Sequence, residues 1–119
     1  MTSRPLAIPL CLLVAACASI SSNPTEMSLK PPGASFKINA AAERVKDCAI
    51  PKLDSTPLFI TGESRPAAVR TVGPAIQIYV QDEFVAVYLV ELTAGQAKVW
   101  APRAAILEQI AGIIKLCSS

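Results

Sequence analysis

The chain contains no histidine among its 119 residues and only five glycines. Histidine is the commonest general base and a frequent metal ligand, so its absence excludes a Ser-His-Asp triad and most zinc sites. Glycine-rich phosphate-binding loops and the GxSxG element of hydrolases are missing from the sequence too. We therefore expect a protein that is not an enzyme and that uses no cofactor or metal.

A strong charge of one sign is also lacking. The chain has 11 Lys and Arg against 9 Asp and Glu, a formal net charge of +2, and the basic residues are scattered. Nucleic-acid binding requires basic residues concentrated on one face of a domain. We therefore expect no nucleic-acid partner.

Carboxylates remain as residues that could support catalysis. Asp82 and Glu83 are adjacent, and their position between two apolar runs predicts a solvated turn. Glu91 interrupts an apolar run, and we expect it to form a cross-strand ion pair with Lys98. An enzyme of unrecognised type that uses Glu91 is the alternative.

No apolar run is long enough to cross a membrane, but residues 6–16 are apolar and follow the basic residue Arg4. A membrane span needs about 20 apolar residues, whereas the apolar part of a signal peptide has roughly 7–15. Polar residues follow soon after this run. We therefore predict a signal peptide over residues 1–16.

The apolar run ends in Leu13-Val14-Ala15-Ala16-Cys17, which resembles the lipobox of bacterial lipoproteins. The resemblance implies cleavage before Cys17 and a lipid on its thiol, which would anchor the chain to a membrane. Ala18 follows instead of Asp, and for such lipoproteins this favours the outer membrane, with the protein facing the periplasm. An ordinary signal peptide, cut between Ala18 and Ser19, is the alternative.

The next segment, residues 17–33, has Ser, Asn and Thr, three prolines and few large apolar residues. This composition is typical of a flexible tether. Residues 34–119 then remain as a single domain. A domain of this size buries a modest share of its surface, so a covalent cross-link would help to stabilise it.

The cysteines can supply that cross-link. Cys11 lies in the predicted signal peptide and Cys17 would carry lipid, so Cys48 and Cys117 remain. Two remaining cysteines in an exported protein suggest one disulfide. Two buried free thiols are the alternative.

Two stretches show the apolar spacing of helices, one before the middle of the chain and one at its end. Asn39 is expected to cap the first helix, and Pro51 to end it near residue 49 or 50. Pro102 is expected at the first position of the second helix. Cys48 and Cys117 lie on the apolar faces of these helices, so a bridge would join the helices at the core.

Between these helices the apolar period changes to two, which is typical of strands. Ile76, Ile78 and Val80 share one face of such a strand, and Gln77 and Tyr79 share the other. The connections are short and polar, as between antiparallel neighbours. The predicted strands cover residues 58–61, 67–72, 75–80, 84–92 and 97–100.

The order helix, strands, helix predicts an α+β fold, with an antiparallel meander of three to five strands and both helices packed on one face. The layout resembles that of small proteobacterial lipoproteins of uncharacterised function. The residues that carry this resemblance are Lys46-Asp47-Cys48, the strand at 85–92, the hairpin at Gly95 and the end Ile113-Ile114-Lys115-Leu116-Cys117. The resemblance implies no particular activity.

We expect a lipid-anchored periplasmic protein that acts by contact with another envelope protein. Its partners would be the membrane, through lipid on Cys17, and an envelope protein that the sequence does not identify. The alternatives are an inhibitor, immunity or exclusion lipoprotein, which blocks an envelope enzyme or receptor, and a structural envelope protein.

Two surfaces are candidates for that contact. The first is the segment over residues 62–74, because loops on a rigid scaffold commonly carry binding residues. The second is a sheet face turned away from the helices, although its apolar side chains are expected to fill the core instead. These side chains are Phe84, Ala86, Tyr88, Val90 and Trp100.

Overall fold

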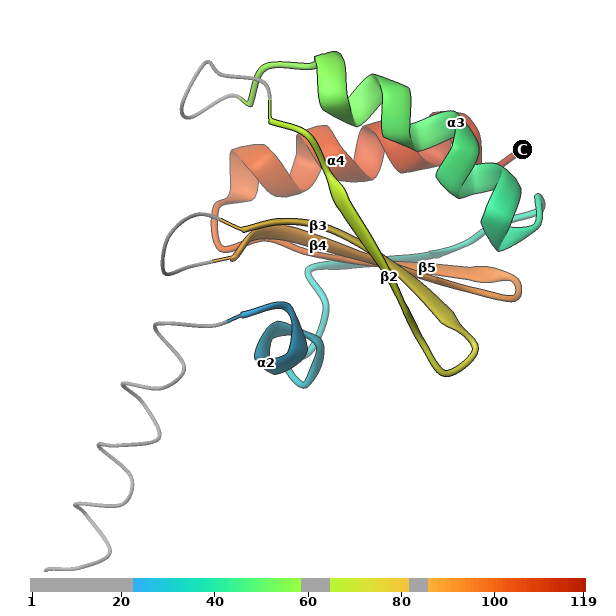
Figure 1. The fold of residues 1–119 in the computed structure, drawn as a ribbon, viewed down its shortest axis with the longest axis horizontal. Coiled ribbons are helices and arrows are strands. Elements are labelled where there is room, and N and C mark those ends of the chain that lie inside the picture. Colours follow the sequence, from blue (N-terminus) through green and yellow to red (C-terminus); the bar gives the residue numbers. More distant parts are fainter. Residues whose placement is uncertain (1–22, 59–64, 82–85) are drawn as a thin grey trace, which may run out of the picture.

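The computed structural model describes residues 23–58, 65–81 and 86–119. Five strands form one antiparallel sheet in the order β1-β5-β4-β3-β2 (Figure 1). The strands are β1 (Ala34–Lys37), β2 (Ala68–Val72), β3 (Ala75–Gln81), β4 (Ala86–Thr93) and β5 (Gln96–Trp100). The helices are α2 (Pro24–Ser28), α3 (Ala42–Ser55) and α4 (Ala104–Cys117). The predicted α+β fold is confirmed, with β2 to β5 as the meander and β1 added beside β5.

The turn between β4 and β5 sets the register of these two strands. Thr93 pairs with Gln96, so that Ala94 and Gly95 alone form the turn. Gly95 has a φ of 81°, a conformation that glycine adopts without the steric cost of a Cβ atom. The hairpin that the sequence predicted at Gly95 is therefore present.

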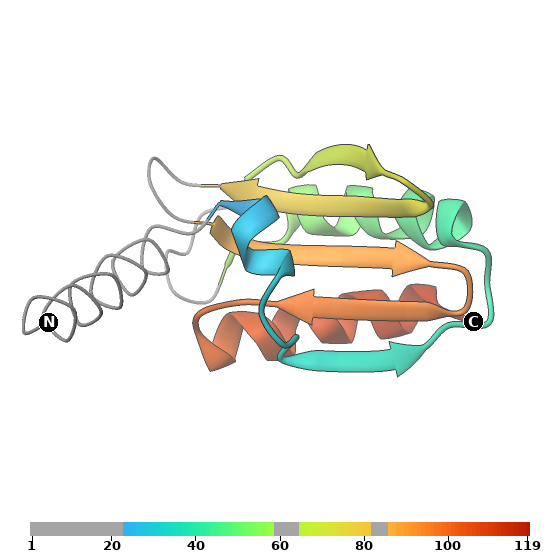
Figure 2. The ribbon, with the colours of Figure 1, turned by 90° about the horizontal axis from the view of Figure 1, so that it is seen from below.

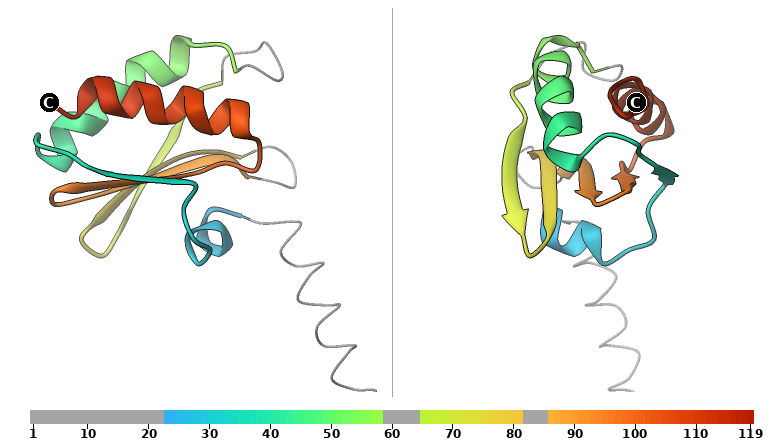
Figure 3. Two further views of the ribbon diagram at one scale, coloured as in Figure 1. Left: turned by 180° about the vertical axis from the view of Figure 1, so that it is seen from behind. Right: turned by 90° about the vertical axis from the view of Figure 1, so that its right-hand side faces the viewer.

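One face of the sheet carries the main hydrophobic core. Ile76, Ile78 and Val80 point to this face, as their alternation predicted. The helices α3 and α4 lie across it (Figures 1 and 3) and pack against each other. Each fully buried Val, Leu or Ile side chain stabilises the fold by about 1.5–3 kcal/mol. The helical residues buried in this core include Val45, Ala49, Leu53, Ile106, Ile110 and Ile114.

The opposite face of the sheet, called the second face below, carries α2 (Figure 2). Residues 23–33 were expected to belong to a flexible tether, but here they are folded against the domain. The Asn23 side-chain oxygen accepts a hydrogen bond of 2.9 Å from the Glu26 amide, and Pro24 is the first residue of the helix. An Asn cap, a proline at the first position and an acidic first turn all favour the start of a helix.

The start of α3 differs from the sequence-based prediction. Asn39 does not cap it, since the helix begins at Ala42 and its N-cap residue is Ala41. The Asn39 and Ala40 amides instead donate hydrogen bonds of 2.8 and 3.1 Å to the carbonyl oxygen of Ser118. These bonds to the far end of the chain hold residues 39 and 40 outside the helix.

The predicted end of α3 is also wrong, because Pro51 lies inside a helix that continues to Ser55. Proline removes one backbone donor and disfavours helix at the residue before it. Leu53 lies beyond Pro51 and is 3% exposed in the core, so its burial offsets this cost. The last helix, α4, starts at Ala104, two residues after Pro102.

Three predicted features lie wholly or mostly outside the described residues: the signal peptide with Cys17, the strand at 58–61 and the turn at Asp82-Glu83. Within the part of the chain that the structure describes, no helix has the length and hydropathy to cross a membrane.

Candidate functional site

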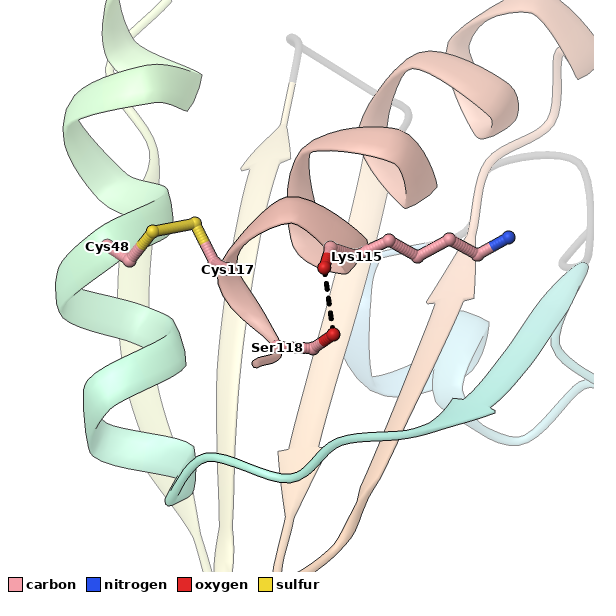
Figure 4. Close-up of a disulfide and its surroundings, with 4 residues drawn as sticks. All are labelled: Cys48, Lys115, Cys117 and Ser118. Carbon is pink, nitrogen blue, oxygen red and sulfur yellow. Dashed lines mark hydrogen bonds between the residues drawn. A yellow bond between two sulfur atoms is a disulfide. The ribbon is translucent and has the colours of Figure 1, made fainter.

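The two cysteines of the folded domain form a disulfide. Cys48 lies on α3 and Cys117 is the last residue of α4, and the sulfur atoms are 2.03 Å apart (Figure 4). The Cα atoms lie 5.6 Å apart although 69 positions separate the residues along the chain. The predicted bridge between the two helices is therefore present, and the alternative of two free thiols does not hold. Cys17 lies outside the described residues, so its lipidation remains a prediction.

The chain end beyond the bridge is fastened to the start of the domain. The Ser118 hydroxyl donates a 2.8 Å hydrogen bond to the carbonyl oxygen of Lys115 (Figure 4). The Lys115 ammonium lies 5.2 Å from the centre of the Phe36 ring on β1, in a cation–π contact. Together with the Ser118 bonds to residues 39 and 40, these contacts join the C-terminus to the segment between β1 and α3.

On the second face, α2 covers a small apolar cluster. Met27, Leu89 and Trp100 are buried there, and Tyr79 packs against them. The Trp100 indole nitrogen donates a 2.8 Å hydrogen bond to the carbonyl oxygen of Lys30. A buried indole N–H normally needs such a partner, so this bond accounts for the only polar atom of the Trp100 side chain.

Beside this cluster lies a hydrogen-bonded chain of polar side chains. Gln77 is 2% exposed, and its oxygen accepts a 2.6 Å bond from the Arg70 Nε atom. Its amide nitrogen donates a 2.9 Å bond to a carboxylate oxygen of Glu91. Arg70 also donates to the Thr25 hydroxyl at 3.0 Å and lies over the Tyr79 ring. Each end of the buried amide is thus satisfied by a charged partner, which gives stronger bonds than neutral pairs do.

This chain changes the role expected of Glu91. Strands β4 and β5 place Glu91 directly opposite Lys98, as predicted. No ion pair joins these two described residues, because the carboxylate of Glu91 turns toward Gln77. Glu91 is therefore a structural acceptor on the second face, where it interacts with Gln77 and not with Lys98.

Tyr88 places an unpaired polar atom in the main core. Tyr88 is 1% exposed, and its hydroxyl has no hydrogen-bond partner among the residues that the structure describes. Burial, with a smaller contribution from the Asp54 carboxylate, raises the pKa of Tyr88 well above its ordinary value. The hydroxyl therefore stays protonated throughout the neutral range.

The apolar surface predicted away from the helices divides between the two faces. Tyr88 and Val90 lie in the main core, as expected, whereas Trp100 lies on the second face under α2. The side chains of Phe84 and Ala86 lie outside the described part.

The candidate segment over residues 62–74 contains the strand predicted at 67–72. Its residues 68–72 form β2, which is the edge of the sheet and pairs with β3 alone. Val69 and Val72 on this strand are 46% and 47% exposed. An edge strand presents free backbone donors and acceptors to which an extended segment of another protein can pair.

Met27 and Arg70 attach α2 to the sheet, and the sequence did not predict this role for either residue. The available indication was the run Asn23-Pro24-Thr25-Glu26, which has the order of an N-cap, a proline and an acidic residue in the first turn. Five residues of helix are too few for an apolar period to be visible.

In the described ranges no group of three or more His, Cys, Asp or Glu side chains is placed to hold a metal ion. Comparisons with protein-family models, with curated proteins and with solved structures found no match to this chain.

Proposed function

We propose that this chain is an exported lipoprotein, held at the outer membrane by lipid on Cys17 and facing the periplasm. The observation that carries the proposal is the Cys48–Cys117 disulfide. Disulfides persist in oxidising compartments and are rare in the cytosol, where thiols are kept reduced. A structural bridge at the core therefore supports export, which the composition of residues 1–16 indicates independently.

The same bridge supports the role proposed for Cys17. It occupies both cysteines of the folded domain, so Cys17 has no intramolecular partner there. In a secreted protein, an extra cysteine implies some other chemistry. Attachment of lipid, at the end of an apolar segment with small residues before it, is the chemistry that the sequence pattern favours.

We propose further that the domain acts by protein–protein contact rather than by catalysis. The chain has no histidine, and the buried amide of Gln77 is bonded to both Arg70 and Glu91. These groups stabilise the sheet and the attachment of α2. The exposed edge strand β2 offers a surface on which a partner can pair.

Mass spectrometry of the membrane fraction tests the anchor. We expect the first peptide of the mature protein to begin at a diacylated Cys17. A Cys17→Ala variant should lose the lipid and leave the outer-membrane fraction in a density gradient, while a Ser19→Ala variant should behave as the wild type. A mature peptide that begins at Ala18 or Ser19, or an intact Met1, would contradict the anchor.

Chemical cross-linking in whole cells, followed by capture from solubilised envelopes, tests the protein contact. The wild type should capture an envelope protein that the Cys17→Ala variant captures less, because that variant is no longer held near the membrane. Equal capture by the wild type and by Cys17→Ala would show that the protein contact does not depend on the lipid anchor.

A second candidate function is that of an inhibitor, immunity or exclusion lipoprotein that blocks one envelope enzyme or receptor. The observation that favours it is the exposure of Val69 and Val72 on the edge strand. A blocking protein of this kind should bind one partner stoichiometrically through β2. Val69→Lys should then abolish capture, whereas Leu116→Lys, at an exposed apolar position on α4, should not.

A further inference from the structure

The folded domain begins well before residue 34. Met27 is 6% exposed, the Trp100 side chain bonds to the carbonyl of Lys30, and the Gly33 amide donates a 2.9 Å hydrogen bond to the carbonyl of Val99. Gly33 also packs closely on α4, because a Cβ atom at position 33 would lie 2.7 Å from a terminal methyl group of Leu107. The segment from α2 to β1 is therefore packed as part of the folded domain.

This leaves a short connection to the proposed anchor. Only residues 18–22 lie between Cys17 and Asn23. The six Cα-to-Cα steps from Cys17 to Asn23 span about 20 Å when the chain is fully extended. No conformation of these residues can reach farther. The tether expected over residues 17–33 would have reached about 55 Å on the same basis.

The connection joins the domain on the second face. The helix α2 contacts β4, the middle strand of the five, and lies on the side of the sheet opposite α3 and α4 (Figures 2 and 3). Strand spacing puts β4 roughly 10 Å from either edge strand. The outer surface of the α3–α4 layer lies a further 15 Å or so beyond the sheet, and α2 lies about 10 Å on the other side. The path from α2 around an edge to that layer is thus about 35 Å, which exceeds the reach of residues 18–22.

We propose that the second face, with α2, is the membrane-facing surface of this protein and contacts a phospholipid surface, while α3 and α4 face the periplasm. The inference rests on the proposed function, because it needs the lipid on Cys17. In this orientation, the surface available to a protein partner consists of α3, α4 and the edge strand β2.

The chemistry of the second face suits phospholipid headgroups. Leu29, the residue after α2, is 82% exposed, the largest exposure among the large apolar side chains described. An apolar side chain beside basic ones can enter the boundary between headgroups and acyl chains. Each Lys or Arg near an anionic surface adds about 1 kcal/mol of attraction. On this face and α2, basic side chains outnumber acidic ones, with Lys30, Lys37, Arg70 and Lys98 against Glu26 and Glu91.

Lysine acylation followed by mass spectrometry tests the orientation. The full-length protein is expressed with its lipid, and the lipid on Cys17 is verified. The protein is then compared in detergent and in vesicles of phosphatidylethanolamine with a minority of phosphatidylglycerol. We expect acylation of Lys30 and Lys98 on the second face to slow at least five-fold in vesicles. Lys52 on α3 and Lys115 on α4 should react at the same rate in both.

A variant with ten Gly and Ser residues inserted after Ser22 is the matched control. Its longer connection should remove most of the protection of Lys30 and Lys98 while the lipid and the membrane association remain. Equal protection of all four lysines, or protection of Lys52 and Lys115, would overturn the orientation. If Lys30 and Lys98 remain protected in the insertion variant, the short connection is not the cause of their protection. Absence of lipid on Cys17 would instead overturn the proposed function, and the orientation with it.

Discussion

The indole nitrogen of Trp100 donates its hydrogen bond to the backbone of Lys30, a residue 70 positions earlier in the chain. This bond fastens the segment after α2 to the end of β5. Met27 is buried in the same apolar cluster as Trp100 and Leu89. The two contacts join a segment of tether-like composition to the centre of the sheet.

Met27→Ala should release α2 from the sheet. Truncation of a buried Met costs about 2 kcal/mol or more, because packing is lost and a cavity is left. We expect the Lys30 and Gly33 amides, which donate to Met27 and Val99 carbonyls, to exchange with deuterium about 30-fold faster. Leu29→Ala is the control, since that side chain is exposed and its loss should leave exchange at both amides unchanged. Equal exchange in wild type and Met27→Ala would show that α2 is held by other contacts.

Removal of the disulfide should destabilise the whole domain. Closing a loop of 69 positions restricts the unfolded chain, which corresponds to about 4 kcal/mol of stability. The Cys48→Ala/Cys117→Ala double variant should therefore melt on the order of 15 °C or more below the wild type. Each single variant should melt near the double one, because the bridge needs both residues. An unchanged melting temperature in calorimetry would mean that the bridge adds no stability.

Tyr88→Phe should change the response of the protein to alkaline pH. Since burial raises the pKa of Tyr88 in the folded state, its stabilising contribution is complete below pH 10. Above that pH the unfolded chain loses the Tyr88 proton first, so the free energy of unfolding falls by about 1.4 kcal/mol per pH unit from this group. Tyr88→Phe should remove this decrease of the free energy of unfolding with pH, measured by urea titrations at several pH values between 9.5 and 11. Tyr79→Phe, at the only other tyrosine, should keep it.

The same variant should be no less stable than the wild type at neutral pH. An unpaired buried hydroxyl costs about 1–3 kcal/mol relative to a paired one, and phenylalanine removes it at nearly constant shape. A loss of more than 1 kcal/mol in Tyr88→Phe would show that the hydroxyl has a partner in solution.

Gln77→Leu should destabilise the second face. The substitution removes the amide that bridges Arg70 and Glu91, and it leaves two charged groups without this partner. Loss of such bonds costs about 1–3 kcal/mol in urea unfolding. Gln96→Leu is the matched control, because Gln96 is exposed at the β4–β5 hairpin. Equal stability of both variants would contradict the bridging role of Gln77.

The strands between α3 and α4 were predictable because the alternation of apolar residues that marks a strand is local in the sequence. Alternation of Ile76, Ile78 and Val80 against Gln77 and Tyr79 assigned the two faces of β3 correctly. The apolar period of the last helix placed Cys117 in the core. The ends of α3 were predicted wrongly, because Asn39 bonds to Ser118 and the burial of Leu53 carries the helix past Pro51.

The sequence by itself determined the class of fold and the pairing of Cys48 with Cys117. Both follow from the spacing of apolar residues and from the cysteine count. Two cysteines remain once Cys11 is assigned to the predicted signal peptide and Cys17 to the predicted lipid site. Only the tertiary structure decided that residues 23–33 belong to the domain and that Glu91 bonds to Gln77. The physical reason is that these contacts join residues far apart in the chain, where no local periodicity records which side chains will meet.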